Sequence, residues 1–167
     1  MPILAGDEWT AAMAAKIADP PRARVLQTVA QTIPNNAFTA LNFDVEDFKV
    51  NFTHLTSGDT TYLQCVVAGL YLVSGGCYFD SNGTGVRGLK FQKNGVDVVG
   101  SSATILAVSA GWQPGPVVRP TYIDLAVNDK VTMLAVQNAG GSLNTYVALG
   151  YTQASMQAHL VQDASLR

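Results

Sequence analysis

Two histidines are the side chains best suited to acid–base chemistry in this chain. Nucleophilic catalysis needs a serine, cysteine or threonine that is activated by a base, and a third group usually orients that base. His54 and His159 lie far apart in the sequence, and neither has a Ser-x-Gly turn, a cysteine partner or a spaced carboxylate. The pattern therefore predicts a protein that is not an enzyme and that uses no cofactor.

Two short polar segments offer the oxygen ligands that a hard metal ion requires. Asp44, Glu46 and Asp47 form one segment, and Asp80 with Asn82 forms the other. Calcium takes six to eight oxygen ligands, and the second segment lacks the spaced acids and the closing glutamate of a calcium loop. We therefore expect a hydrogen-bonded turn at Asp80, a solvated acidic loop at residues 44–47 and no metal site. A metal ion at residues 44–47 is the less favoured alternative.

The two cysteines, Cys65 and Cys77, both stand inside apolar runs. Two cysteines in a chain of this length fit neither a disulfide-dense framework nor a paired zinc motif. We expect two small buried side chains, with a disulfide between neighbouring strands as the less favoured alternative.

Aromatic residues are the remaining candidates for recognition. Trp112 lies in a segment framed by glycine and proline with Gln113 beside it, an arrangement typical of a platform that stacks on a sugar or anchors a partner. The alternative is that Trp112 folds back over the end of a sheet. Tyr71, Tyr122 and Tyr146 fall on expected strands, where each lies either between subunits or in the core of one subunit.

Charged residues make up only 13% of the 167-residue chain, against about 25% in an ordinary soluble domain. Much of the surface is therefore uncharged or covered, which favours an oligomer. The formal net charge of −2 offers no basic field for nucleic acid or for an anionic membrane. We recognise no signal peptide and no membrane-spanning window, so we expect synthesis in a cytosol and no membrane insertion.

Residues 61–80 hold two apolar runs, 62–67 and 70–79, which predict a pair of central strands joined at Ala68 and Gly69. Shorter strands are expected on both sides, and the last one, 155–161, alternates Met156, Ala158 and Leu160 inward. About ten short strands with no helix between them predict an all-β fold, a ten-stranded antiparallel jelly-roll sandwich.

Two turn sequences predict hairpins between these strands. Asn94 and Gly95 separate the segments 86–92 and 96–99, and both residue types tolerate the positive φ of a type I′ turn. Asn128 and Asp129 separate 122–127 from 130–137 in the same way. We expect a hairpin at each place.

The N-terminal residues have a different pattern. Trp9, Met13 and Ile17 recur at helical spacing within 6–19, so a short N-terminal α-helix is predicted before Pro20 and Pro21. This divides the chain into a helical anchor with a proline-rich spacer, 1–23, and a jelly-roll domain, 24–167. The apolar stripe either packs on its own domain or attaches to a larger assembly.

Several segments together resemble a known family. FTALNF at 38–43, GLYLV at 69–73, LKFQKNG at 89–95 and LAVNDKV at 125–131 follow one another in this order. They resemble the globular head of complement component 1q and tumour necrosis factor, in the versions found in bacteriophage and bacterial proteins. The resemblance spans 24–161 and implies a ten-stranded jelly roll packed as a compact homotrimer. Some relatives bind calcium, so the resemblance is compatible with a calcium site in this chain.

Two departures from the animal members limit what the resemblance implies. The chain has no collagen-like Gly-X-Y stalk, and residues 156–160 replace the aromatic-rich ending of those members. The animal receptor and immune functions are therefore not expected here.

These observations lead to a hypothesis of function. The chain is expected to be a non-enzymatic structural protein of a phage virion, either a trimeric fibre or tail-tip protein or a capsid-decoration protein, made in the host cytoplasm. Its jelly roll would project outward to bind the host surface or a cell-surface glycan. The N-terminal helix would attach it to other virion proteins. The alternative is a free bacterial lectin-like binding module that belongs to no virion.

Overall fold

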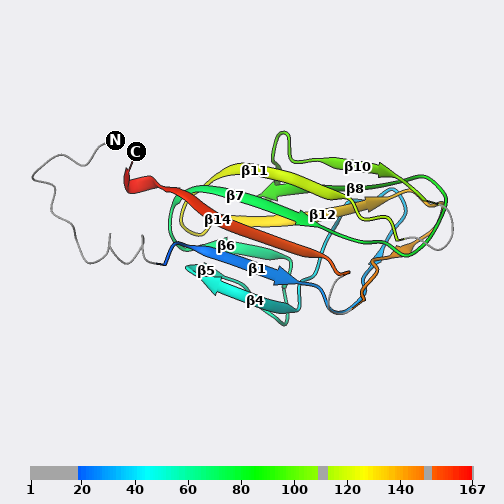
Figure 1. The fold of residues 1–167 in the computed structure, drawn as a ribbon, viewed down its shortest axis with the longest axis horizontal. Helices are drawn as coiled ribbons and strands as arrows, with labels where there is room; N and C mark the ends of the chain where they lie inside the picture. Colours follow the sequence, from blue (N-terminus) through cyan, green and yellow to red (C-terminus); the bar gives the residue numbers. More distant parts are fainter. Residues whose placement is uncertain (1–18, 109–112, 149–151, 167) are drawn as a thin grey trace, which may run out of the picture.

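The computed structural model describes residues 19–108, 113–148 and 152–166 of the chain (Figure 1). In these residues the backbone forms fourteen β-strands and one 3₁₀-helix, η1, at Ala164–Leu166. The strands are β1 (Arg22–Leu26), β2 (Thr32–Ile33), β3 (Thr39–Ala40), β4 (Val45–Val50), β5 (Phe52–Thr53), β6 (Tyr62–Cys65), β7 (Gly69–Gly76), β8 (Val86–Lys93), β9 (Val96–Asp97), β10 (Ala103–Leu106), β11 (Val117–Leu125), β12 (Lys130–Gln137), β13 (Leu143–Asn144) and β14 (Ser155–Asp163).

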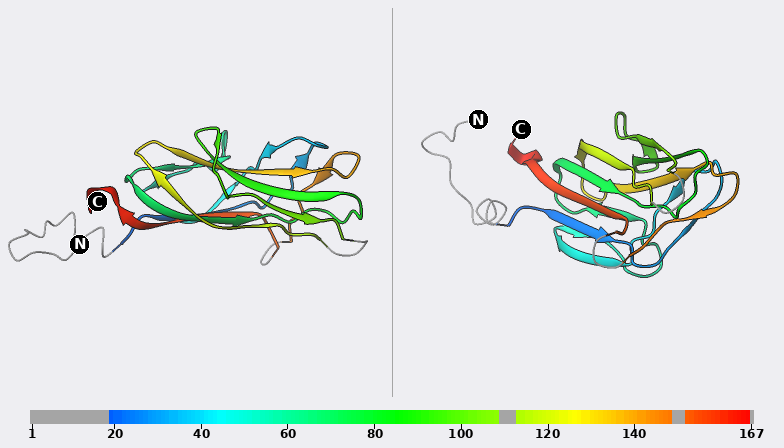
Figure 2. Two further views of the ribbon diagram at one scale, coloured as in Figure 1. Left: turned by 90° about the horizontal axis from the view of Figure 1, so that it is seen from above. Right: turned by 45° about the vertical axis from the view of Figure 1, so that its right-hand side comes forward.

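The strands form two large sheets that pack as a sandwich, and a small third sheet. The five-stranded sheet has the order β11-β7-β14-β1-β4. The seven-stranded sheet has the order β10-β8-β12-β6-β5, with β3 beside β12 and β9 beside β8. The third sheet pairs β13 with β2, and all pairs in the three sheets are antiparallel. Figures 1 and 2 show β1 beginning at the same end of the sandwich as η1, so the described chain enters and leaves at that end.

The core lies between the two large sheets and follows from alternation along the strands. Every second residue of β7 is buried, because successive side chains in a strand point to opposite faces of the sheet. The buried residues of the five-stranded sheet meet those of the seven-stranded sheet, including Phe91 and Met133. Tyr71 is fully buried there, and its hydroxyl donates a hydrogen bond of 2.5 Å to the carbonyl oxygen of Val67. The polar end of this large ring is therefore satisfied inside the core.

One predicted hairpin is confirmed, and the other is wrong. β8 and β9 pair around Asn94 and Gly95, whose φ angles are 51° and 81°, as a type I′ turn requires. Asn128 also has a positive φ, of 73°, but the strands before and after it, β11 and β12, belong to different sheets. This turn carries the chain from one layer of the sandwich to the other.

The predicted central pair is partly wrong for the same reason. β6 and β7 are both strands with alternating burial, as expected. They do not pair, because β6 lies beside β12 and β5 in the seven-stranded sheet, whereas β7 lies between β11 and β14 in the five-stranded one. The Ala68–Gly69 step is therefore a crossing between layers.

The predicted fold class needs correction in its details. The described residues hold fourteen strands in three sheets rather than ten, and they contain no α-helix. The N-terminal helix expected at 6–19 lies, apart from Asp19, outside the described residues. The acidic stretch was expected to be a loop, but it begins strand β4, which pairs with β1 and bulges at Asp47. Pairing with a neighbouring strand has overridden the weak strand propensity of these acids. In the described part of the chain, no helix has the length and apolar character needed to cross a membrane.

Two glycines with the same backbone conformation differ in their surroundings. Gly58 and Gly85 have φ angles of 80° and 79°. A Cβ atom at Gly58 would meet nothing within 4 Å, whereas one at Gly85 would collide with the backbone carbonyl and side chain of Asn138. Alanine substitutions at these two positions therefore separate the energetic cost of backbone strain from the cost of crowding.

We predict that Gly85→Ala destabilises the protein by about 2–4 kcal/mol, because crowding adds to the strain of a positive φ. The matched variant Gly58→Ala should cost only about 1 kcal/mol, since strain acts there alone. Urea unfolding at one chain concentration measures both, because the stability of an oligomer depends on concentration. Equal losses in the two variants would contradict the close approach of Asn138.

Candidate functional site

The three predicted interface tyrosines have different environments. Tyr71 is fully buried in the core of one chain, which is the second of the two places expected for it, so it offers no surface to a neighbouring subunit. Tyr122 lies on the edge strand β11 and is 63% exposed, with its register partner Leu72 beside it on β7. Tyr146 is half-buried, and its backbone N–H donates a hydrogen bond to the carbonyl oxygen of Tyr78.

The predicted glycan platform falls only partly within the described residues. Trp112 lies outside them, and Gln113 is half-buried. The predicted anchor residues Trp9, Met13 and Ile17 also lie outside them. Recognition by these residues stays a prediction.

The two histidines occupy separate parts of the molecule. His54 is buried between β5 and β6, with Nε2 3.3 Å from the carbonyl oxygen of Thr60 and Nδ1 3.4 Å from a carboxylate oxygen of Glu46. His159 lies on the outward face of the five-stranded sheet, with its ring 6.0 Å from that of Phe48. Partial burial, and then the nearby charge of Arg22, lower the pKa of His159. This lowered pKa favours the neutral form of the ring at pH 7.

The carboxylates of the first acidic segment point to different partners. Asp44 accepts hydrogen bonds from the backbone N–H and the hydroxyl of Thr28. Burial acts to raise the pKa of Asp44, but these hydrogen bonds outweigh it, so the pKa is lowered. Asp47 forms an ion pair with Arg24 at 3.2 Å, and Glu46 forms one with Lys49. No group of three histidines, cysteines or acids able to hold a metal gathers within the described residues.

The second polar segment is held by an arginine that sequence reasoning missed. Asn82 accepts a hydrogen bond from the backbone N–H of Thr84, so the predicted turn forms two residues later, at Asn82 rather than Asp80. Arg87 is fully buried and donates to the carbonyl oxygens of Asn82, Thr84 and Val86 at 2.9–3.0 Å. These hydrogen bonds hold the loop at residues 82–84 against the start of β8. Arg87 shares the strand phase of inward Leu89 and Phe91, which was the signal that could have revealed it.

The cysteines agree with their predicted role. Cys65 and Cys77 are free and buried. Burial raises the pKa of both thiols, so neither is a reactive thiolate at neutral pH.

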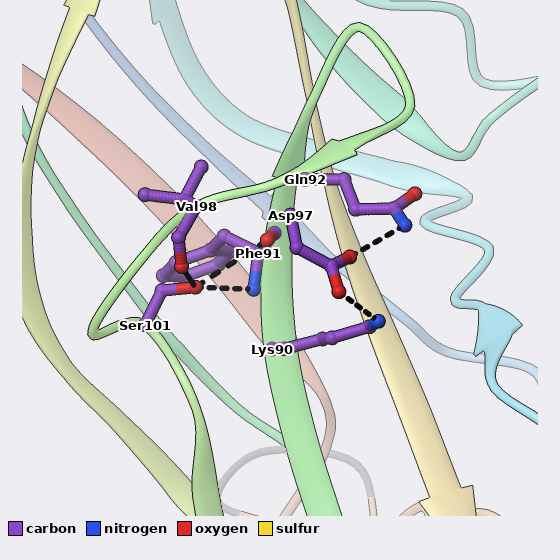
Figure 3. Close-up of polar contacts among 6 residues, drawn as sticks. All are labelled: Lys90, Phe91, Gln92, Asp97, Val98 and Ser101. Carbon is purple, nitrogen blue, oxygen red and sulfur yellow. Dashed lines mark hydrogen bonds and ion pairs between the residues drawn. The ribbon is translucent and has the colours of Figure 1, made fainter.

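The outward face of the seven-stranded sheet is polar at its centre, where charges are paired within the chain, and it also exposes two large apolar side chains, Leu106 on β10 and Phe38 against Lys90. Lys90 contacts a carboxylate oxygen of Asp97 at 2.6 Å, and Gln92 donates to the other oxygen at 2.8 Å (Figure 3). Lys130 lies 3.9 Å from the ring centre of Tyr62 on the same face. The paired charges favour contact with solvent at the centre of this face.

The outward face of the five-stranded sheet is different, and one half of it is apolar. In the half nearer η1, the register places Leu72 and Tyr122 on one side of the face and Phe48 and Val50 on the other. Leu70 lies two residues before Leu72, at the start of β7. We call these five residues the apolar half. The two basic groups between them add little charge, because the lowered pKa of His159 favours its neutral form and Arg22 pairs with Asp19. The carboxylate of Asp124 borders this half beside Leu70. The other half of the face is mixed and contains a hollow.

We predict that Asp44→Asn lowers stability by about 1–2 kcal/mol at neutral pH, because the hydrogen bonds from Thr28 then reach a neutral acceptor. The folded pKa of Asp44 lies below its unfolded value of 3.8, so its stabilisation is present above pH 3.8 and is lost as the pH falls through the folded pKa. Urea unfolding from neutral pH to about pH 2 measures the difference between wild type and variant, which should vanish in acid.

The exposed Asp97 provides the control for this experiment. Asp97→Asn should have a smaller effect that added salt removes, because its ion pair with Lys90 faces solvent. A difference at Asp44 that persists unchanged at low pH would rule out the carboxylate as its source.

Sequence comparisons give no relative for this chain. No protein-family model matches it, and no curated protein sequence matches it either.

Solved structures do show its fold. The globular domain of zebrafish complement 1qA protein matches with a TM-score of 0.59 and 16% identity over 86% of this chain and 98% of that chain. Eiger TNF from S. frugiperda matches with a TM-score of 0.57 and 13% identity over 86% and 95%. Murine APRIL matches with a TM-score of 0.61 and 10% identity over 84% and 98%. The described chain therefore has a jelly-roll fold like that of complement component 1q and tumour necrosis factor.

Proposed function

We propose that this chain is a non-enzymatic binding module that assembles as a homotrimer and serves as a structural protein of a bacteriophage particle. The observation that carries the trimer is the contrast between the two outward sheet faces. The centre of one face pairs its own charges. The apolar half of the other groups leucine, valine and aromatic side chains, of which Tyr122 is 63% exposed and the rest are half-buried, and a single carboxylate, Asp124, borders them beside Leu70. Apolar strand surface of this kind is typically covered by a partner.

A second copy of the same chain is the occupant that we assign to the apolar half. A closed symmetric oligomer covers this surface on every copy and leaves no open edge to propagate. Tyr122 stands on the edge strand β11, so it can reach a neighbouring copy. The resemblance of the sequence to complement-component-1q and tumour-necrosis-factor heads favours three copies over the commoner two.

The placement on a phage particle rests on two supports. The sequence segments resemble the bacteriophage versions of this family more than the animal versions. The described chain also enters and leaves at one end of the sandwich, where the backbone N–H of Leu160 donates to the carbonyl oxygen of Pro21 (Figures 1 and 2). Attachment at that end would leave the opposite loops free to contact a host surface. A fibre or tail-tip position and a capsid-decoration position both suit this geometry.

The non-enzymatic part of the proposal rests on the histidines. His54 is buried against a backbone carbonyl and Glu46, and His159 lies on the other sheet beside Phe48. Neither has a hydroxyl or thiol nucleophile as a hydrogen-bond partner in the described part of the chain.

We predict that the purified protein has three times the 17.6 kDa mass of one chain in light scattering coupled to size exclusion. Interfaces of this kind bury on the order of 2,000 Å² or more, so the trimer should persist on dilution. Leu72→Asp should release single chains, because it places a carboxylate at the centre of the apolar half. The matched control is Thr132→Asp, on a central strand of the polar face, which should stay trimeric. A wild-type mass of one or two chains refutes the trimer.

We also predict that the protein is present in purified, mature particles of the phage that encodes it. Quantitative mass spectrometry of those particles measures the copy number relative to the major capsid protein. A few copies indicate the tail, and numbers near the count of capsid symmetry positions indicate the head. Presence in the lysate but absence from the particles would contradict the proposal and favour a free binding module.

A further inference from the structure

The mixed half of the five-stranded sheet contains a hollow of about 520 Å³, to which β1, β4, β7, β11 and β14 contribute. This volume lies within the range of about 300–1,000 Å³ that is typical of small-molecule sites. The hollow faces outward and lies in the half of the face farther from η1, next to the apolar half.

Small residues create the space. Gly76 on β7 has Ser155 of β14 and Val117 of β11 as its register partners, and its outward position carries no side chain. A Cβ atom there would already lie 3.3 Å from a methyl carbon of Val117. A larger side chain at position 76 would occupy part of the hollow, so the glycine at this position keeps the space open.

Two polar pairs line the hollow and retain unused hydrogen-bonding capacity. The amide of Gln157 donates to the hydroxyl of Ser74 at 3.0 Å, which leaves the amide oxygen and the serine O–H available. Arg24 donates to one carboxylate oxygen of Asp47 at 3.2 Å, and both side chains remain about two-fifths exposed. The second carboxylate oxygen and further N–H groups of Arg24 are therefore open to a ligand.

An aromatic ring completes the lining. Tyr78 reaches the hollow, and its ring packs on Gly115, where a Cβ atom would come within 2.6 Å of the ring. The ring is therefore held in place from one side. Together with Leu26 and Val117 it adds apolar surface next to the polar pairs.

This combination selects one chemical class of ligand. The charges of Arg24 and Asp47 cancel, so an anion would meet the carboxylate and a cation would meet the guanidinium. A purely apolar ligand would cover four polar side chains without replacing their hydrogen bonds with water. A saccharide offers hydroxyl groups that both donate and accept, and carbon-bound hydrogens that pack on an aromatic ring.

We propose that this hollow binds a neutral saccharide of one or two rings. Ser74, Gln157, Arg24 and Asp47 bind its hydroxyl groups, and Tyr78 packs against its carbon face. The inference rests on the proposed function in one respect, since it supplies the ligand of the proposed binding module. It places recognition within the described residues, on the sheet, rather than at Trp112 and Gln113.

The test uses the full chain and a panel of neutral monosaccharides and disaccharides, namely glucose, galactose, mannose, rhamnose, N-acetylglucosamine and disaccharides of each. Saturation-transfer NMR should detect binding of at least one of them, and titration then gives its affinity. Gln157→Leu should weaken that affinity at least tenfold, because it removes hydrogen bonds worth roughly 1.4 kcal/mol or more to a bound hydroxyl. Gln92→Leu on the polar face is the matched control and should leave the affinity unchanged.

Light scattering of each variant separates this inference from the proposed trimer. A trimeric wild type that binds none of the panel overturns the saccharide site and leaves the trimer standing. A monomeric wild type that binds a sugar through Gln157 overturns the trimer only. Dissociation of Gln157→Leu into single chains would show that the hollow is a subunit contact, and equal affinities in the two leucine variants would show that the sugar binds elsewhere. Either result overturns the inference.

Discussion

The five-stranded sheet depends on the pairing of β14 with β1 on one side and with β7 on the other. This ladder joins residues 22–26 to residues 155–163, near the opposite end of the chain, and without it β1 and β4 would have no connection to β7 and β11. Its inward residues Met156 and Ala158 are fully buried, so the same ladder also closes the core. The apolar half and the hollow both lie across β14. Each exists only when the most distant contact in the sequence has formed, which is typical of slowly folding β-sandwiches.

Local features of the fold could be predicted from the sequence, because they depend on neighbouring residues. The turn at Asn94 and Gly95, the inward phase of Met156 and Ala158, and the free buried cysteines all follow from patterns within a few residues. Pairing partners could not be predicted in the same way. A positive φ at Asn128 suits a turn between layers as well as a turn within a hairpin, and the choice depends on β7 and β8, which lie far away in the sequence.

The candidate site was harder to predict than the fold, for a similar reason. Alternation along β7 places Tyr71 and Leu72 on opposite faces, but the sequence alone does not show which face is the core. The hollow draws on five strands, and its central features are a missing side chain at Gly76 and a bulge at Asp47. A position that matters because it is empty gives no signal in residue type. Only the register of β7, β11 and β14 shows that Gly76 faces outward beside Ser155.

The outward face of the five-stranded sheet has two parts because its charged and polar side chains are paired and exposed differently along the strands. Near η1, Arg22 pairs with Asp19 and the lowered pKa of His159 favours its neutral form, so the leucine and aromatic side chains there have little charge among them, with Asp124 at their border, and are best covered by protein. Farther along the same strands, Arg24 and Asp47 hold each other while both stay partly exposed, and Ser74 and Gln157 keep unused donors and acceptors. Covering these groups with an apolar neighbour would leave them unsatisfied, which is costly in a buried interface. The physical chemistry of the face therefore favours a subunit contact that ends where the hollow begins, so that each copy in an assembly presents its hollow at the border between subunits.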